Sequence, residues 1–246
     1  MVFDYFSQSR YVPASSRSKT QFMLPLIVAI DGPSGSGKST LGRMISRALN
    51  LLYIDTGSMY RAVALATIEA GVDPQDRNAV IKLAETLDIN LEGDPDSLRT
   101  FIGTRDVSDL IRTEAVTAMS SIVSAIPGVR RAMVMRQREL GRRGAVLNGR
   151  DITTVVFPDA SYKFFLTADA NERAQRRFLE EQANHHETTF AETFADMTER
   201  DHRDMTRADS PLKIADDAIV IDSTGKSIEQ VFREMMNKIE KKEEQV

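Results

Sequence analysis

The stretch AIDGPSGSGKSTLGRM, residues 29–44, places a glycine-rich centre between an apolar end and a helical pattern. Its spacing matches G-x-x-x-x-G-K-S/T at Gly32, Gly37, Lys38 and Ser39. The run before it, 25–31, is rich in β-branched residues and predicts a buried strand, while the apolar residues after it recur at helical spacing. A loop between a strand and a helix is the context in which this pattern binds phosphates.

The glycines of this loop let its backbone turn so that successive N–H groups point inward. With the N-terminus of the following helix, these groups form a site for anions. The Lys38 ammonium can reach the β- and γ-phosphates, and the Ser39 hydroxyl can ligate Mg²⁺. The loop therefore predicts a site for a nucleoside triphosphate, but it does not identify the group that receives the phosphate.

Strand and helix patterns alternate along the rest of the chain. Strands are predicted at 25–31, 51–55, 144–149, 162–168 and 217–223. Helices are predicted after the loop and at 58–71, 78–87, 113–125, 128–142 and 227–242, with a long polar helical region over 171–207. This order predicts an α/β fold, a P-loop NTPase core whose parallel sheet is flanked by helices. Short alternating runs over 88–110 predict a small antiparallel insert.

Composition and charge argue against several classes of protein. The 246 residues carry a net charge of −4, which argues against a general binder of nucleic acid or acidic membranes. No run approaches the roughly 18 apolar residues of a membrane span, and the absence of cysteine fits a cytoplasmic location. Residues 1–24 are rich in Ser and Arg, and predict a disordered tail or an organelle-targeting segment before a kinase domain at 25–246.

Three further stretches bear on the acceptor: DTGSMYR (55–61), NGRDITTVVFPDA (148–160) and ERDHRDMTRADSPL (199–212). The first two follow predicted strands, where open α/β sheets place ligands. The third spaces three arginines at i, i+3 and i+7, which favours a cationic lid over transferring phosphates. Each stretch also has a plainer interpretation, as a capped helix, a surface ion pair or a solvated charged face.

Taken together, the motifs resemble bacterial-type cytidylate kinases, a family of nucleoside monophosphate kinases. The resemblance runs from about residue 26 to the end and rests on 32–40, DTGSMYR, IRTEAV, SAIPGVRRAMVMRQR, GRD..TVVFPDA, RDHRDMTRADSPL and DSTGKSIEQV. It implies transfer of the γ-phosphate of ATP to CMP or dCMP with Mg²⁺. It also implies a small monophosphate-binding insert at about 75–117 and a helical lid at about 171–212.

The resemblance assigns roles to individual residues. ATP would be bound by Gly32, Pro33, Ser34, Gly35, Ser36, Gly37, Lys38, Ser39 and Thr40. The acceptor would be bound by Thr56, Tyr60, Arg61, Ser121, Arg130, Arg150, Asp151, Arg200, Asp204 and Arg207. Within that set, Ser121, Arg130 and Asp151 would bind the edge of the cytosine base, and Arg61 and Arg150 would bind the acceptor phosphate. Catalysis would depend on Lys38, Arg150, Arg203 and Arg207, the last two bridging both phosphates from the lid.

Two residues depart from the family pattern. Asn148 stands where the family usually has an acid that helps to hold waters of the magnesium ion, and Asp55 is a second candidate to supply that charge. Thr153 stands where the family usually has glycine, and we expect its side chain to crowd the loop that carries Arg150.

Two other functions compete with this interpretation. A kinase for UMP, or for UMP and CMP together, would differ at the base pocket rather than at the glycine loop. A nucleotide-dependent switch would have no second phosphate to hold, so the arginines of the acceptor side and the lid argue against it. We expect a monomer with ATP and CMP or dCMP as its ligands, and the sequence leaves the preference between CMP and dCMP open.

Overall fold

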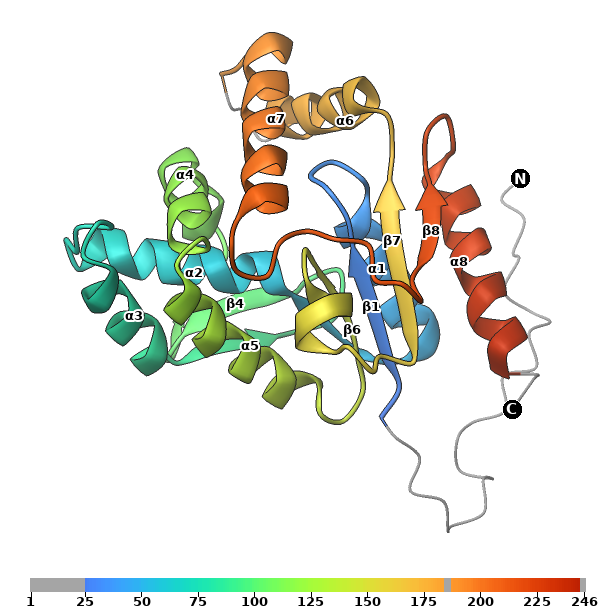
Figure 1. The fold of residues 1–246 in the computed structure, drawn as a ribbon, viewed down its shortest axis with the longest axis horizontal. Helices are drawn as coiled ribbons and strands as arrows, with labels where there is room; N and C mark the ends of the chain where they lie inside the picture. The colour runs from blue at the N-terminus through green and yellow to red at the C-terminus, as the bar shows by residue number, and fades with distance from the viewer. Residues whose placement is uncertain (1–24, 184–186, 244–246) are drawn as a thin grey trace.

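A parallel sheet of five strands forms the centre of the fold (Figure 1). Its strands are β1 (Ile27–Asp31), β2 (Leu52–Asp55), β6 (Ala145–Gly149), β7 (Tyr162–Thr167) and β8 (Ile219–Asp222). They lie in the order β2-β6-β1-β7-β8, and every neighbouring pair is parallel. The computed structural model describes residues 25–183 and 187–243, so the predicted tail at 1–24 lies outside the described residues. The α/β class predicted from the sequence is confirmed.

Alternate residues of β1 lie in two hydrophobic cores, one on each face of the sheet. Ile27 and Ala29 belong to one core, and Val28 and Ile30 to the other, because successive side chains of a strand point to opposite faces. Helices cover both faces (Figure 1), which is why the strands are apolar runs rather than alternating ones. The first core includes residues of α2 (Thr56–Glu69) and α5 (Pro127–Gly141), and the second includes residues of α1 (Lys38–Leu49) and α8 (Ile228–Glu243).

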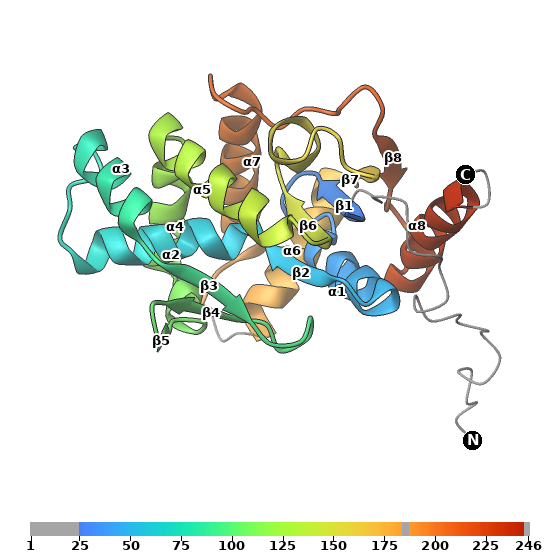
Figure 2. The same cartoon turned by 90° about the horizontal axis from the view of Figure 1, so that it is seen from below.

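The predicted antiparallel insert is present beside α2. Figure 2 shows a sheet of three strands there, away from β7 and β8, in the order β3-β4-β5 with antiparallel pairing. Its strands and the flanking elements are α3 (Arg77–Thr86), β3 (Ile89–Glu92), β4 (Arg99–Ile102), β5 (Arg105–Asp106), η2 (Leu110–Arg112) and α4 (Glu114–Val123). Helix α4 packs against α2 and so brings the insert to the side of the main sheet.

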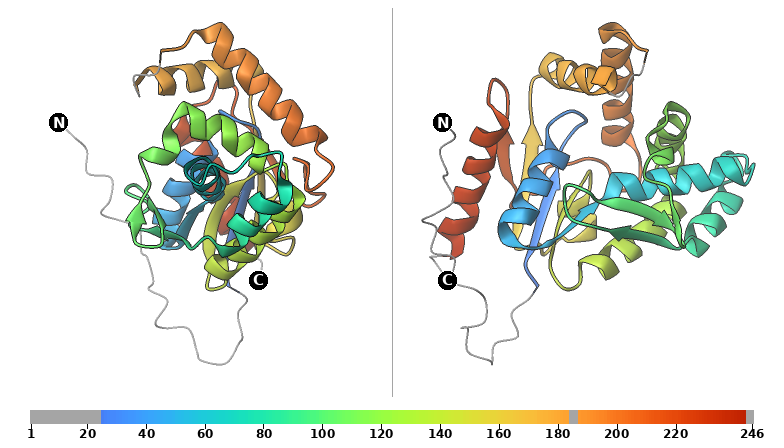
Figure 3. Two further views of the ribbon diagram at one scale, coloured as in Figure 1. Left: turned by 90° about the vertical axis from the view of Figure 1, so that its left-hand side faces the viewer. Right: turned by 180° about the vertical axis from the view of Figure 1, so that it is seen from behind.

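The long helical region predicted over 171–207 is two helices, α6 (Ala170–Ala183) and α7 (Phe190–Thr206). They pack against each other and stand over the carboxyl ends of the strands in both views of Figure 3. The second helix has its own start signal, because the Thr189 hydroxyl accepts the Glu192 N–H and the Glu192 carboxylate accepts the Thr189 N–H. Arg207 lies just beyond the end of α7, in extended backbone.

Over the described ranges 25–183 and 187–243, no helix combines the length and the apolar character needed to cross a membrane.

Candidate active site

A cleft of about 840 Å³ opens at the carboxyl ends of β1, β2 and β6. Its lining includes the glycine loop after β1, the start of α2, the loop after β6, and α7 with the residues that follow it. Residues of η2, α4, α5, α6 and the region from β8 into α8 complete it. Because the strands are parallel, the segments that leave them all emerge at this edge. The three stretches that the sequence analysis singled out are therefore brought to one site.

The glycine loop needs glycine where other backbone comes close. A Cβ at Gly32 would lie 2.0 Å from the Leu166 carbonyl oxygen, and one at Gly35 would lie 2.5 Å from the Arg173 carbonyl oxygen. Both residues also have positive φ angles, of 148° and 70°. The loop leads into α1, which begins at Lys38. Residues 34–40 line the cleft, so the first amides of α1 lie at its wall.

Lys38 is buried and folds back on its own loop. Its ammonium donates to the Pro33 carbonyl and to the Ser36 hydroxyl. Burial and the nearby Arg150 guanidinium lower the pKa of Lys38 well below its ordinary value. The Asp201 and Asp31 charges only partly offset this shift, and a phosphate group in the loop would add to them.

Helices α6 and α7 both contact the apex of the glycine loop. The Asp201 carboxylate of α7 accepts the Ser34 N–H at 3.0 Å and pairs with the Arg173 guanidinium of α6 at 2.5 Å. Arg173 also donates to the Ser34 carbonyl at 2.9 Å. Sequence reasoning missed this pair, since no periodic or motif signal joins two residues on different helices.

Across the cleft, one carboxylate holds two guanidiniums. Asp204 accepts from Arg150 at 2.8 Å and from Arg207 at 3.1 Å. Burial alone would raise the pKa of Asp204, but the two arginines lower it, so the group is a carboxylate. Arg200 also lines the cleft, and burial together with the Arg150 charge lowers its pKa to about 10. Arg61 completes this side and pairs with Asp55 at 3.3 Å.

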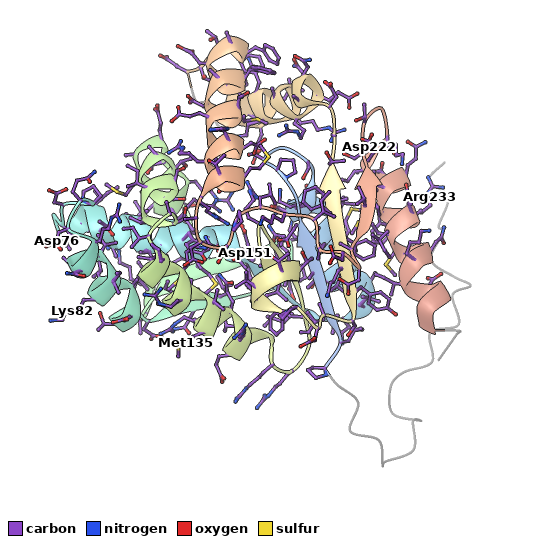
Figure 4. The ribbon with its side chains drawn as sticks, viewed as in Figure 1. Asp76, Lys82, Met135, Asp151, Asp222 and Arg233 are labelled. Atoms are coloured by element: carbon purple, nitrogen blue, oxygen red, sulfur yellow. The ribbon has the colours of Figure 1, made fainter. Side chains whose placement is uncertain are left out.

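A buried ion pair lies deeper in the same cleft. The Arg130 guanidinium donates to the Asp151 carboxylate and, at 3.1 Å, to the Ser124 carbonyl. It also lies over the Tyr60 ring, 5.3 Å from the ring centre. Figure 4 shows Asp151 near the middle of the fold, below α7. Among the described residues, Tyr60 Oη and Arg130 Nε are buried without hydrogen-bond partners, so the pocket holds polar atoms that its own side chains leave unmatched.

Oxygen atoms suited to a magnesium ion gather between β2, β6 and α1. The Asn148 amide donates to the Ser39 hydroxyl at 3.2 Å and to the Asp55 carboxylate at 3.4 Å. Its own oxygen, Oδ1, is buried without a hydrogen-bond partner among the described residues. A hydroxyl, a carboxylate and an amide oxygen are ligands that Mg²⁺ accepts, usually together with substrate phosphates and water. The residues fit the ion, and in the described part of the chain no cluster of three acidic, His or Cys side chains forms a separate cage.

Two predicted residues do not reach the cleft. The Arg203 side chain is 45% exposed and pairs with Glu199 at 3.5 Å. The buried side of α7 includes Asp201, and Arg203 lies two residues further, about 200° round the helix. Ser121 does not line the cleft either. Two nearby residues do: Ser120 on α4, and Ser124 at the end of that helix.

The remaining predicted residues lie at or beside the cleft. Thr56 lines it, and its hydroxyl donates to the Asn148 carbonyl at 2.7 Å. Thr40 also lines it, while Gly32 and Pro33 form the base of the loop outside the lining.

The family model for cytidylate kinase matches residues 28–241. The chain belongs to the cytidylate kinase family. It is 47% identical over 211 residues to a cytidylate kinase of Geobacter sp. (strain M21), which covers 85% of this chain and 91% of that protein. It is 45% identical over 219 residues to the cytidylate kinase of Geobacter sulfurreducens, covering 89% and 94%.

A solved structure shares the fold at low identity. An uncharacterized protein from Eubacterium ventriosum superposes with a TM-score of 0.50 at 11% identity, over 88% of this chain and 98% of that one. At this identity the likeness supports the α/β fold alone. The cytidylate kinase assignment therefore depends on the family match and on the relatives.

The contact of α6 and α7 with the glycine loop leads to a prediction about Asp201. In Asp201→Asn the amide oxygen can still accept the Ser34 N–H, but the largely buried Arg173, whose side chain is 13% exposed, loses its counter-charge. We expect the free energy of unfolding to fall by about 3 kcal/mol, the usual cost of removing one partner of a buried pair. Urea denaturation followed by circular dichroism measures it.

The matched control is Glu199→Gln on the same helix. Glu199 pairs with Arg203 on the surface, so its loss should change the free energy of unfolding by less than about 1 kcal/mol. Equal effects of the two substitutions would contradict this prediction.

Proposed function

We propose that this protein transfers the γ-phosphate of ATP to CMP or dCMP, releasing ADP and CDP or dCDP. The observation that carries the proposal is a cleft whose lining contains two groups of residues suited to bind anions. One is the glycine loop with Lys38. The other is the acceptor cluster, made of Arg61, Arg150, Arg200 and Arg207. Membership of the cytidylate kinase family and relatives named cytidylate kinase support the same reaction.

The buried pair beside the acceptor cluster is suited to cytosine. Cytosine presents an amine donor next to ring and carbonyl acceptors, and Asp151 with Arg130 offers an acceptor next to donors. Uracil presents a carbonyl where cytosine has the amine, so it would leave a buried carboxylate facing an acceptor. A site built to match hydrogen bonds discriminates strongly against such a mismatch.

Phosphoryl transfer needs positioning and charge neutralisation more than covalent help from the protein. The Lys38 ammonium and the first amides of α1 lie on the donor side, and Arg150 and Arg207 lie on the acceptor side. Asp204 holds these two arginines in one arrangement, which limits the reorganisation that a substrate must induce. Closure of α6 and α7 would exclude water, so that the monophosphate oxygen rather than water attacks.

A bound Mg²⁺ would neutralise charge on the β- and γ-phosphate oxygens. Ser39 would ligate it directly, and Asp55 with Asn148 would hold it or its waters. We further propose that the insert at about 75–117 binds the monophosphate, that 171–212 is the lid, and that the enzyme acts as a monomer in the cytoplasm. The insert and the lid follow from the resemblance to cytidylate kinases, and a sequence without cysteine fits the cytoplasm.

A coupled assay of ADP release tests the reaction. With ATP and Mg²⁺, we expect fast release with CMP and dCMP, and slow release with UMP, AMP or no acceptor. Comparable rates with UMP would favour a broader pyrimidine kinase. ADP release that ignores every monophosphate would favour a nucleotide-dependent switch and reject the proposal.

Two arginines three positions apart on α7 give a matched test of the acceptor cluster. Arg200 lines the cleft, whereas Arg203 faces solvent. We expect Arg200→Ala to lower kcat/KM for CMP by about 100-fold, as removal of a charge-stabilising donor does elsewhere. Arg203→Ala should change it by less than about threefold, because an exposed pair contributes little. Steady-state kinetics with CMP varied decides, and a larger loss for Arg203→Ala would restore the lid role expected from the sequence.

Asn148 gives a prediction about the metal. Asn148→Asp would place a carboxylate against Ser39 and Asp55, which adds charge where the ion is proposed to bind. We expect the Mg²⁺ concentration for half-maximal activity to fall several-fold. We also expect the thermal midpoint without Mg²⁺ to fall, because two carboxylates then repel each other. An unchanged Mg²⁺ titration would show that residue 148 does not face the ion.

A further inference from the structure

Asp31 is a buried carboxylate that the proposed reaction does not use. It ends β1, directly before the glycine loop, and is 0% exposed. Its Oδ1 accepts the Ile152 N–H at 2.9 Å. Its Oδ2 accepts both the Thr153 N–H and the Thr153 hydroxyl, each at 2.7 Å. All three bonds reach across the sheet edge to the loop after β6.

The bonds fasten the start of a single wide turn, η3 (Ile152–Val156), which closes with the Phe157 N–H on the Ile152 carbonyl at 2.8 Å. The first amides of a helical turn have no partner within it, so the carboxylate of Asp31 acts as their cap from another strand. The other end of the turn is held by Arg138 of α5, which donates to the Val155 and Val156 carbonyls at 2.7 and 2.8 Å.

Two residues of the proposed acceptor site, Arg150 and Asp151, directly precede this turn. A change in the turn therefore moves the guanidinium that faces the phosphates and the carboxylate that faces the base. A threonine at 153, expected from the sequence to crowd the loop, instead fits with its side chain buried and its hydroxyl hydrogen-bonded.

Thr153 supplies the one side-chain donor among these three bonds. Burial raises the pKa of Asp31 to about 6, and the donors from Thr153 and Ile152 oppose that rise. The charged groups that face Asp31 are Asp151, which favours its protonated form, and Lys38, whose ammonium favours the carboxylate. Without the hydroxyl, the balance moves toward a protonated Asp31.

We propose that Thr153 is a positioning residue: its hydroxyl keeps the Asp31 carboxylate ionised and directed at the turn, and so holds Arg150 and Asp151 in place for the acceptor. The roles of these two residues rest on the proposed function. A protonated Asp31 would offer a hydroxyl toward amides that are themselves donors, and the cap would weaken. Activity therefore falls as the pH drops through the pKa of Asp31, and loss of the Thr153 hydroxyl brings that fall to a higher pH.

The test compares two neighbouring threonines of the same turn. Thr153→Val removes the hydroxyl with little change of shape, and Thr153→Ser retains it. Thr154→Val is the matched control, because the Thr154 hydroxyl has no hydrogen-bond partner among the described residues. At saturating ATP and CMP, we expect Thr153→Val to lower kcat about tenfold at pH 7 and to raise the acid limb of kcat by about one pH unit. The serine variant and the control should stay within about twofold of the wild type.

A readout without turnover separates this proposal from the proposed function. The pH titration of the Asp31 carboxyl carbon, followed by NMR and assigned with Asp31→Asn, should have a higher midpoint in Thr153→Val than in the wild type or the control. An unchanged midpoint overturns the proposal. So does a lower thermal midpoint in Thr153→Val with kcat and its acid limb unchanged, since the threonine would then be structural only. A wild type that shows no CMP-dependent ADP release would instead reject the proposed function, and the titration would still decide whether Thr153 controls Asp31.

Discussion

The parallel register of β1 with β6 is the constraint on which the site depends. It pairs Ile30 with Asn148 and Asp31 with Gly149, so the two strands end together and their following loops leave side by side. Strand β2 joins on the far side of β6 and places Asp55 opposite Asn148. Any slip of this register would separate the glycine loop from the loop that carries Arg150, because each loop is fixed to the end of its strand.

Charge balance explains how so many cations can be buried in one cleft. Three carboxylates, those of Asp151, Asp201 and Asp204, each hold a buried or partly buried guanidinium in hydrogen-bond contact. They do not balance everything, since burial and a neighbouring arginine lower the pKa of both Lys38 and Arg200. The cleft therefore carries unrelieved positive charge, and anionic ligands lower its electrostatic cost on binding.

Features that lie close together in the chain could be predicted, and features that depend on a meeting of distant elements could not. The glycine loop is one contiguous motif, and the strand pattern before it and the helix pattern after it identify it as a phosphate-binding loop. The apolar runs predicted the strands. Ser121 and Arg203 lie outside the lining of the cleft, because a shift of one or two residues along a helix turns a side chain away from it. The hydrogen bonds of Asp201 with Ser34, and of Asp31 with Thr153, join elements far apart in sequence, and no local pattern reports them.

These two hydrogen bonds also connect the glycine loop with the other segments that line the cleft. Asp201 connects α7 to the glycine loop, and Asp204, about one turn further along the same helix, accepts hydrogen bonds from Arg150 and Arg207. Asp31 directly precedes that loop and is hydrogen-bonded to Thr153, in the turn that follows Arg150. The glycine loop is therefore connected to the segment around Arg150 along two routes, one through α7 and one through the sheet edge. The bonds through Asp31 are buried and those through α7 are partly buried, so both routes consist of hydrogen bonds to carboxylates that are at least partly shielded from water.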